Sequence, residues 1–175
     1  MEEIIEIPDD VEVEKERFTV TVKSGGDTVR KEFSSPRIDV ELDDGEVRLV
    51  TNGDDRKSRA MIGTYRAHIN NMIEGVQEGY VYRLKTVYAH FPMNVKKSNG
   101  EVVIQNFIGE RAPRHVDILE GVSVDIDDDE ITVTGPDKEK VSQTAASIEQ
   151  ECYKGTRDPR RFQDGVYITQ KGGER

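Results

Sequence analysis

Hydrophobic and polar residues alternate along several short stretches of this chain. Residues 18–22, 38–42 and 47–49 each place Val, Ile, Leu or Phe at every second position. A period of two is typical of strands that bury one face, so each stretch is a predicted strand. Gly45, which tolerates positive φ, marks a hairpin turn between the last two. Two more strands, 80–87 and 165–168, are predicted to close the first and second halves.

Two other segments repeat apolar residues at intervals of three and four, which predicts helices with one buried face. The first helix presents Ile62, Ile69, Met72, Ile73 and Val76, and the second presents Val141, Ala145, Ile148 and Cys152. Gly135-Pro136-Asp137 precedes the second helix and suits a helix start.

The chain is similar to itself at a lag of 84 residues. Residues 7–11 correspond to 91–95, and 38–49 correspond to 122–133; the helical segments 62–69 and 141–148 follow at a lag of 79. Chance similarity between two strand-rich halves is the alternative explanation. The repeat favours an α+β fold of two tandem duplicated domains, each a small antiparallel β-sheet covered by one main helix. The expected domains are residues 1–88 and 89–175.

Composition narrows the class of protein. The 175 residues are 34% hydrophobic and 34% charged, with a mean hydropathy of −0.69. No apolar run approaches the ~20 residues of a membrane span, and the Met-Glu-Glu start lacks a basic signal-peptide region. A single cysteine excludes an internal disulfide and fits a reducing compartment. We therefore expect a cytoplasmic protein without a membrane partner.

The charge is uneven along the chain. The net charge is −10, yet residues 150–175 hold six Lys or Arg against four acids, so residues 1–149 sum to −12. Acidic proteins ordinarily avoid nucleic acid; alternatively, the acids hydrate a surface that works in concentrated salt. The reversal of sign at the C-terminal end favours the second interpretation and indicates a surface that meets an anion.

Catalytic and metal-binding patterns are absent from the sequence. His68, His90 and His115 have no acids or thiols at metal-ligand spacing, and Cys152 continues an apolar helix face. Asp127–Asp129 lack the spacing of a calcium loop and suit a turn. No Walker, dinucleotide or nucleophile-elbow motif occurs. We expect no enzymatic activity, no metal and no cofactor.

The basic segment has the residue types of an RNA contact. The guanidinium of arginine can donate two parallel hydrogen bonds to a phosphate group. Gly155 lets the backbone approach a ligand, and Phe162 is placed to anchor the loop in the core. Gln163 and Tyr167 are candidates for hydrogen bonds to sugar hydroxyls. The candidate RNA-binding residues are Lys154, Gly155, Arg157, Arg160, Arg161, Gln163, Tyr167 and Lys171, with Arg111 and Arg114 as secondary candidates.

Longer motifs resemble a known family. The segment 162–171 (FQDGVYITQK) resembles the C-terminal signature of the archaeal and eukaryotic branch of the large-subunit ribosomal protein six family. The segments 61–76, 79–80, 88–93, 106–114 and 134–150 are similar to the same family. The resemblance covers nearly the whole chain.

This resemblance implies a non-catalytic protein of two duplicated α+β domains. Its C-terminal domain would bind large-subunit ribosomal RNA near the sarcin–ricin loop, with neighbouring ribosomal proteins as partners and translational GTPases docking nearby. The alternative, from the acidic composition, is a protein–protein adaptor that does not bind nucleic acid.

Overall fold

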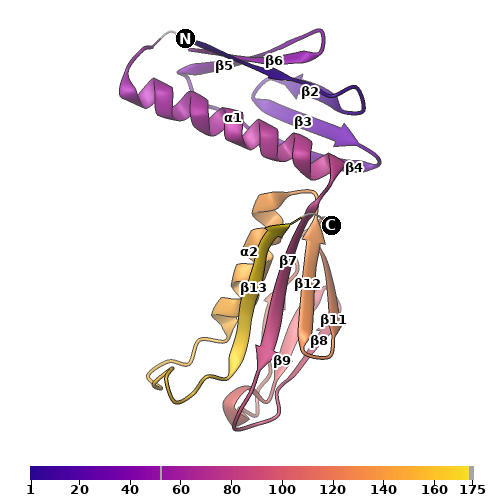
Figure 1. Cartoon of the computed structure of the whole chain (residues 1–175), viewed down its shortest axis with the longest axis vertical. Coiled ribbons are helices and arrows are strands. Elements are labelled where there is room, and N and C mark those ends of the chain that lie inside the picture. The colour runs from indigo at the N-terminus through magenta and orange to yellow at the C-terminus, as the bar shows by residue number, and fades with distance from the viewer. Residues whose placement is uncertain (52, 174–175) are drawn as a thin grey trace. The chain divides into compact units, whose positions relative to one another are not determined.

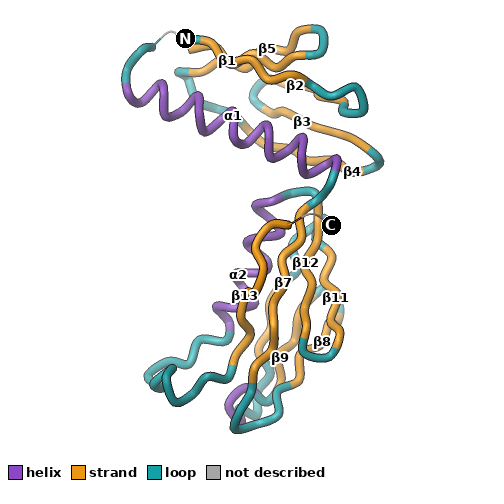
Figure 2. Tube along the Cα trace, in the orientation of Figure 1, coloured by secondary structure: helices purple, strands orange, loops and turns teal. Residues whose placement is uncertain are grey.

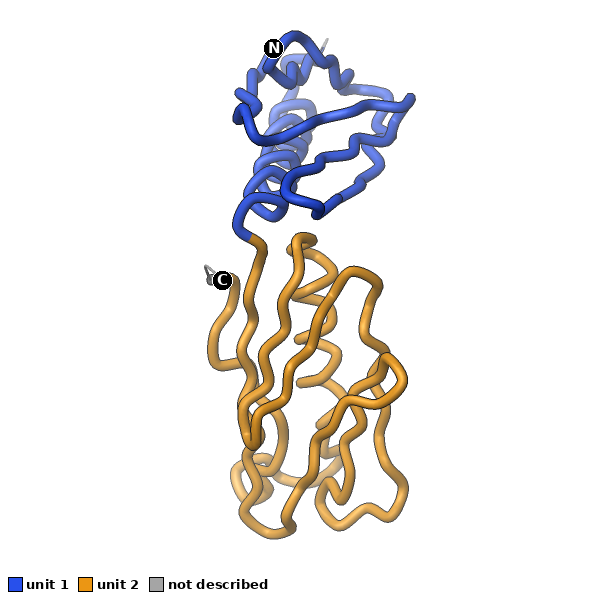
Figure 3. The backbone as a smooth tube through the Cα atoms, turned by 90° about the vertical axis from the view of Figure 1, so that its right-hand side faces the viewer, with its two compact units in different colours: residues 1–78 blue, residues 79–175 orange. Residues whose placement is uncertain are grey.

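The computed structural model describes residues 1–51 and 53–173, which form two compact units, residues 1–78 and 79–175 (Figure 3). Glu174 and Arg175, counted above in the basic C-terminal stretch, lie outside the described residues. Each unit has its own hydrophobic core. The chain is therefore organised as two separately packed bodies.

The N-terminal unit contains two antiparallel sheets of three strands and one helix (Figure 1). Its elements are β1 (Glu2–Glu6), β2 (Glu12–Glu16), β3 (Thr19–Ser24), β4 (Asp27–Glu32), β5 (Ile38–Asp43), β6 (Glu46–Thr51) and α1 (Arg56–Gln77). The strand orders are β1-β6-β5 and β2-β3-β4, and α1 packs against both sheets. Most apolar residues at alternate strand positions, and those on one face of α1, meet in the core, as their periodicity predicts. Phe18 and Leu42 are exceptions, because their side chains are exposed, at 59% and 37%.

The C-terminal unit repeats this arrangement with one additional strand (Figure 2). Its elements are β7 (Tyr80–Val87), β8 (Asn94–Ser98), β9 (Glu101–Gln105), the 3-10 turn η1 (Phe107–Gly109), β10 (Arg114–Asp117), β11 (Ser123–Asp127), β12 (Glu130–Gly135), α2 (Lys138–Glu151) and β13 (Gly165–Gly173). The strand orders are β10-β9-β8 and β11-β12-β7-β13. The helix α2 packs against β13, β7, β12 and β10.

The α+β fold with two repeated domains is confirmed. The strands β6 and β12 are 84 residues apart at both ends, and each forms a hairpin with the preceding strand. Gly45 turns the first hairpin at φ 83°, and Asp128 turns the second at φ 53°. Aspartate is one of the few residues other than glycine that enter this region, so the same bend survives without a glycine. Each unit contains two sheets, where the sequence predicted one.

The strand 80–87 belongs to the C-terminal unit, not to the first half that it was predicted to close. It pairs with β12 on one side and with β13 on the other. In strand order, β7-β12-β11 repeats β1-β6-β5, so this segment begins the second repeat. The compact units consequently divide at residue 78, ten residues before the expected division. Alternation identifies a strand but does not specify its pairing partner, which explains the difference.

The helix α2 directs the chain toward the basic segment. Asp137 caps its first turn, because the Asp137 Oδ1 accepts hydrogen bonds from the backbone N–H of Glu139 (2.9 Å) and of Lys140 (3.3 Å). Val141, Ala145 and Ile148 are fully buried, as predicted. Helix and strand β13 are therefore fixed in the core, and the loop between them joins two rigid elements. Neither described helix has the length and apolar composition needed to span a membrane.

Candidate nucleic-acid interface

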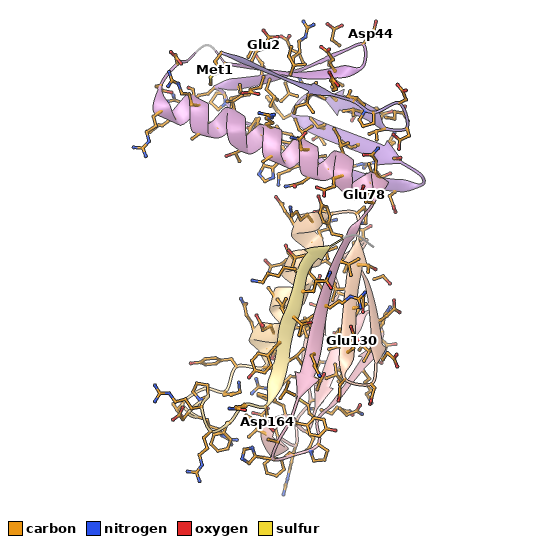
Figure 4. All side chains as sticks on the ribbon, in the orientation of Figure 1. Met1, Glu2, Asp44, Glu78, Glu130 and Asp164 are labelled. Atoms are coloured by element: carbon orange, nitrogen blue, oxygen red, sulfur yellow. The ribbon has the colours of Figure 1, made fainter. Side chains whose placement is uncertain are left out.

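The basic loop, residues 153–164, connects α2 to β13 (Figure 4). Pro159 lacks a backbone N–H, and Gly155 has φ 64°, so the helix does not continue through either residue. Asp158 organises the tip: its Oδ1 accepts from the N–H of Arg160 (2.9 Å), and its carbonyl accepts from the N–H of Phe162 (2.9 Å). This turn places Arg160 and Arg161 consecutively on the exposed outer side of the loop.

Phe162 anchors the loop, as the sequence predicted. Its ring is partly buried against the core of the C-terminal unit and lies 5.3 Å from the His90 ring, between centroids. The guanidinium of Arg157 lies 5.4 Å from the centroid of the Phe162 ring. A cation stacked on an aromatic face keeps its charge accessible, so Arg157 is oriented without being neutralised.

Three arginines of the basic loop are exposed and lack a close acidic partner. Within residues 1–51 and 53–173, the guanidiniums of Arg157, Arg160 and Arg161 form no salt bridge. Hydrogen bonding from Arg114 and, less strongly, the longer-range charge of Arg157 lower the pKa of Glu110. Three unpaired cations within five residues produce a concentrated positive field on a unit that is otherwise mildly acidic. Such a field attracts an anion with several charges, and guanidinium forks match phosphate geometry.

Asp164 ends the basic loop and is almost fully buried, at 1% exposure. Its carboxylate contacts the segment that follows β7: Oδ2 accepts from the backbone N–H of His90 (3.4 Å), and Oδ1 lies 3.2 Å from His90 Nδ1. Burial by itself raises the pKa of Asp164, but hydrogen bonds from His90 and from the backbone N–H of Ala89 outweigh it and hold the pKa below its ordinary value. The sequence suggested only a turn at Asp164-Gly165, because no local sequence pattern indicates that an aspartate is buried.

Replacing Asp164 with Ala should lower the free energy of unfolding of the C-terminal unit by about 2–3 kcal/mol at pH 7, since buried amide donors lose a charged acceptor. Because its pKa is depressed in the folded state, the carboxylate contributes fully above its ordinary pKa of about 3.9, and this contribution is lost as the pH falls through the lower folded value. Urea unfolding at pH 7 and at about pH 3 measures both effects. Asp125→Ala, on the exposed face of β11, serves as the matched control. An equal change in both variants at pH 7 would contradict the anchoring role.

Arg114 lies beneath the basic loop instead of on its surface. Its Nε and Nη2 donate to Glu110 Oε2 (2.9 Å) and Oε1 (2.8 Å), and its Nη1 donates to the carbonyls of Glu151 and of Tyr153, the latter at 3.1 Å. The guanidinium also lies 4.5 Å from the centroid of the Phe107 ring. Hydrogen bonding to Glu110 raises the pKa of Arg114, so the charge is permanent. The arginine therefore satisfies carbonyls at the end of α2, as cations near a helix C-terminus do.

Lys154, Gln163 and Tyr167 form one hydrogen-bonded group. The Lys154 ammonium donates to the Tyr167 hydroxyl (2.8 Å), which donates to the Gln163 carbonyl (2.8 Å). The Gln163 side-chain amide donates to the Arg160 carbonyl (3.4 Å). These bonds fasten the start of the loop to its end. The Tyr167 hydroxyl thus has both a donor and an acceptor within the chain.

The remaining candidates lie at different distances from this group. Gly155 is exposed within the loop, and no atom lies within 4 Å of the position that a Cβ would take. Arg111 is exposed beside Glu110, in the segment that Arg114 ties to the end of α2. Lys171 lies six residues beyond Gly165 along β13, about 20 Å away at 3.3 Å per residue. The structure thus brings the loop residues together and leaves Lys171 apart from them.

Cys152, at the end of α2, is not a reactive thiol. Burial raises the pKa of the Cys152 thiol to about 11, so the thiol remains protonated near neutral pH. Within the described ranges, 1–51 and 53–173, no group of three or more His, Cys, Asp or Glu residues has a geometry that could hold a metal ion. The arrangement is suited to binding an anion.

Comparisons of the sequence with a family model and with known proteins agree with each other. The sequence pattern of the family described as Ribosomal protein L6 matches residues 7–79 and 91–165. The chain is 45% identical to the large ribosomal subunit protein uL6 of Methanococcus vannielii over 172 residues, which cover 98% of this chain and 94% of the relative. It is 46% identical to the protein of the same name from Haloarcula marismortui over 167 residues, 95% of this chain and 94% of the relative. Natronomonas pharaonis has a protein of that name with 44% identity over 166 residues, at coverages of 95% and 94%.

Proposed function

The chain belongs to the ribosomal protein L6 family, of the archaeal type, and from this premise we propose that its C-terminal unit binds large-subunit ribosomal RNA through the basic loop. It is a structural, non-enzymatic constituent of the large ribosomal subunit, in the cytoplasm. Its partners there are the ribosomal RNA and other proteins of the subunit.

One observation carries the assignment of the RNA contact. Arg157, Arg160 and Arg161 are exposed and unpaired among the described residues, on a loop fixed at both ends. Three cations within five residues repel one another, and a bound polyanion relieves this repulsion. Lys154, Gly155, Gln163 and Arg111 lie in or beside the same surface and complete the proposed interface. We assign Arg114 to positioning the loop, and Lys171 to a peripheral contact along β13.

The finer location follows from the family resemblance. The proposed RNA site lies near the sarcin–ricin loop, beside the region where translational GTPases dock. Every candidate RNA-contacting residue lies within residues 89–175, the proposed RNA-binding domain. The strand β7 supports them from within the same sheet as β13.

The N-terminal unit has a different electrostatic character. Residues 1–78 contain 19 acidic and 11 basic residues, a net charge of −8. In the β1-β6-β5 sheet, Glu6, Glu46 and Asp43 stand directly opposite one another across three strands. Like charges in register destabilise a sheet, and Arg48 partly offsets this repulsion, because its guanidinium lies 3.1 Å from Asp43 and 3.8 Å from Glu46. The net charge of −8 favours contact with basic proteins, and it is the observation that supports the adaptor alternative.

Sedimentation separates the two functions. A tagged full-length chain should sediment with large ribosomal subunits in a sucrose gradient containing about 0.5 M salt, because an assembled RNA contact survives screening. The adaptor alternative predicts that the chain remains near the top of the gradient. That result would overturn the proposed function.

A further inference from the structure

A hollow of about 530 Å³ opens between the end of α2, the basic loop and the first residues of β13. Cys152 and Val166 lie at its base and are buried, at 4% and 1% exposure. Tyr153 and Tyr167 contribute two aromatic rings, and Lys154 and Arg157 contribute two cations. We call this hollow the Tyr153 pocket.

Tyr153 is the most exposed of the large hydrophobic side chains among the described residues, at 74% exposure. Its backbone is nevertheless fixed, because its carbonyl accepts a hydrogen bond from Arg114 Nη1 (3.1 Å). An aromatic ring held at an open site, on a rigid backbone, forms a surface on which a planar group can stack at low entropic cost.

The charges that face the pocket are mostly positive. The Lys154 ammonium lies 5.2 Å from the centroid of the Tyr167 ring, and the Arg157 guanidinium lies beside the Phe162 ring. Glu149 is the one carboxylate that lines the pocket in the described chain, and its Oε1 already accepts a hydrogen bond from the backbone N–H of Ile168 (2.9 Å). The pocket therefore combines an apolar base, an aromatic wall and a cationic rim.

We propose that the Tyr153 pocket receives one unpaired nucleotide of the bound RNA. Its base stacks on Tyr153 above Cys152 and Val166, and its phosphate meets Lys154 and Arg157. The volume lies within the ~300–1,000 Å³ typical of ligand pockets, and a base within a duplex cannot enter because it is stacked on both sides. Unstacked bases held on aromatic rings are the usual source of sequence-independent affinity for single strands. This inference rests on the proposed RNA-binding function.

Two hairpin RNAs test the proposal with the full chain. They are identical except that one carries a single bulged adenosine in its stem. At 0.1 M salt the wild-type chain should bind the bulged hairpin about tenfold more tightly, the effect expected of one stacked base. Tyr153→Ala should abolish the tenfold preference and leave the affinity for the paired hairpin unchanged. Tyr153→Phe should retain the preference.

Tyr88→Ala is the matched control, because Tyr88 is also an exposed tyrosine of the C-terminal unit, at 46%, and does not line the pocket. It should keep the tenfold preference. With 2-aminopurine as the bulged base, wild-type chain should quench the emission and Tyr153→Ala should not.

The outcomes distinguish the pocket from the proposed function. Equal, salt-sensitive affinity for both hairpins would overturn the pocket and leave RNA binding intact. Binding to neither hairpin in 50 mM salt would overturn both. Displacement of the bulged hairpin by 1 mM adenosine monophosphate would assign the pocket to free nucleotides. A preference that survives in Tyr153→Ala, while that variant assembles poorly into subunits, would assign the pocket to a protein side chain.

Discussion

Replacing Arg157, Arg160 and Arg161 together with Ala should raise the dissociation constant for RNA by roughly 10²–10³-fold at 0.1 M salt. Each phosphate contact of a cation contributes a slope of about 0.7–0.9 to the dependence of log affinity on log salt concentration. Losing three contacts should therefore reduce this slope by about 2–3. The loss should be similar for all RNA sequences, because phosphate contacts do not distinguish bases.

Filter binding of total large-subunit ribosomal RNA from 0.05 to 0.5 M salt measures both the affinity and the slope. A matched control removes three positive charges elsewhere: Arg30, Arg56 and Lys57 are exposed cations of the N-terminal unit. The control variant should keep its slope and lose little affinity, since none of these three residues belongs to the proposed interface. Equal effects in the two variants would show that net charge, not the basic loop, determines binding.

Replacing Arg114 with Ala should lower the free energy of unfolding of the C-terminal unit by about 2–3 kcal/mol. The substitution removes the paired bonds to Glu110, two carbonyl contacts at the end of α2 and the contact with Phe107. Hydrogen bonds to a charged group contribute about 1.5–3 kcal/mol each when partly desolvated, and the 23% exposure of the Arg114 side chain reduces their sum. Urea unfolding of the full chain provides the measurement.

Arg114→Lys should recover little of the lost stability, because an ammonium cannot form the paired bonds to Glu110 and reach the carbonyls at once. Arg37→Ala is the control: Arg37 pairs with Asp55 across 3.2 Å, but both side chains are half exposed. Its expected cost is below about 1 kcal/mol. If Arg114 were instead a phosphate contact, Arg114→Ala would leave stability unchanged and reduce the salt slope by about 0.9.

Local patterns in the sequence were sufficient for the repeat, for both α-helices and for the strands β3, β5, β6, β7, β11, β12 and β13. The strands β1, β2, β4, β8, β9 and β10 were not predicted. The valines and isoleucines at alternate positions and the apolar face of α2 are buried in the two cores. The lag of 84 residues is the spacing between β6 and β12. The helix start at Gly135-Pro136-Asp137 and the anchoring of the loop by Phe162 were also predicted. These features depend on contacts within a few residues, or on periodicity, and both are visible in one dimension.

The pairing of β7 with β13 joins segments about 80 residues apart, and nothing in the alternation of 80–87 specifies that partner. The roles of Asp164 and Arg114 are hidden for a similar reason. Each residue type suits an exposed loop, and only its long-range partners, His90 for Asp164 and the end of α2 for Arg114, show it to be structural.

By itself, then, the sequence determined the duplicated α+β architecture, the position of the cationic segment and, through its motifs, the family. Tertiary structure alone decided which cations are paired within the chain. Arg157, Arg160 and Arg161 are exposed without a salt bridge in the described chain, while Arg114 is used to hold them. The physical reason is that a charge is available to a ligand only when no group of its own chain neutralises it, and such neighbours come from distant segments.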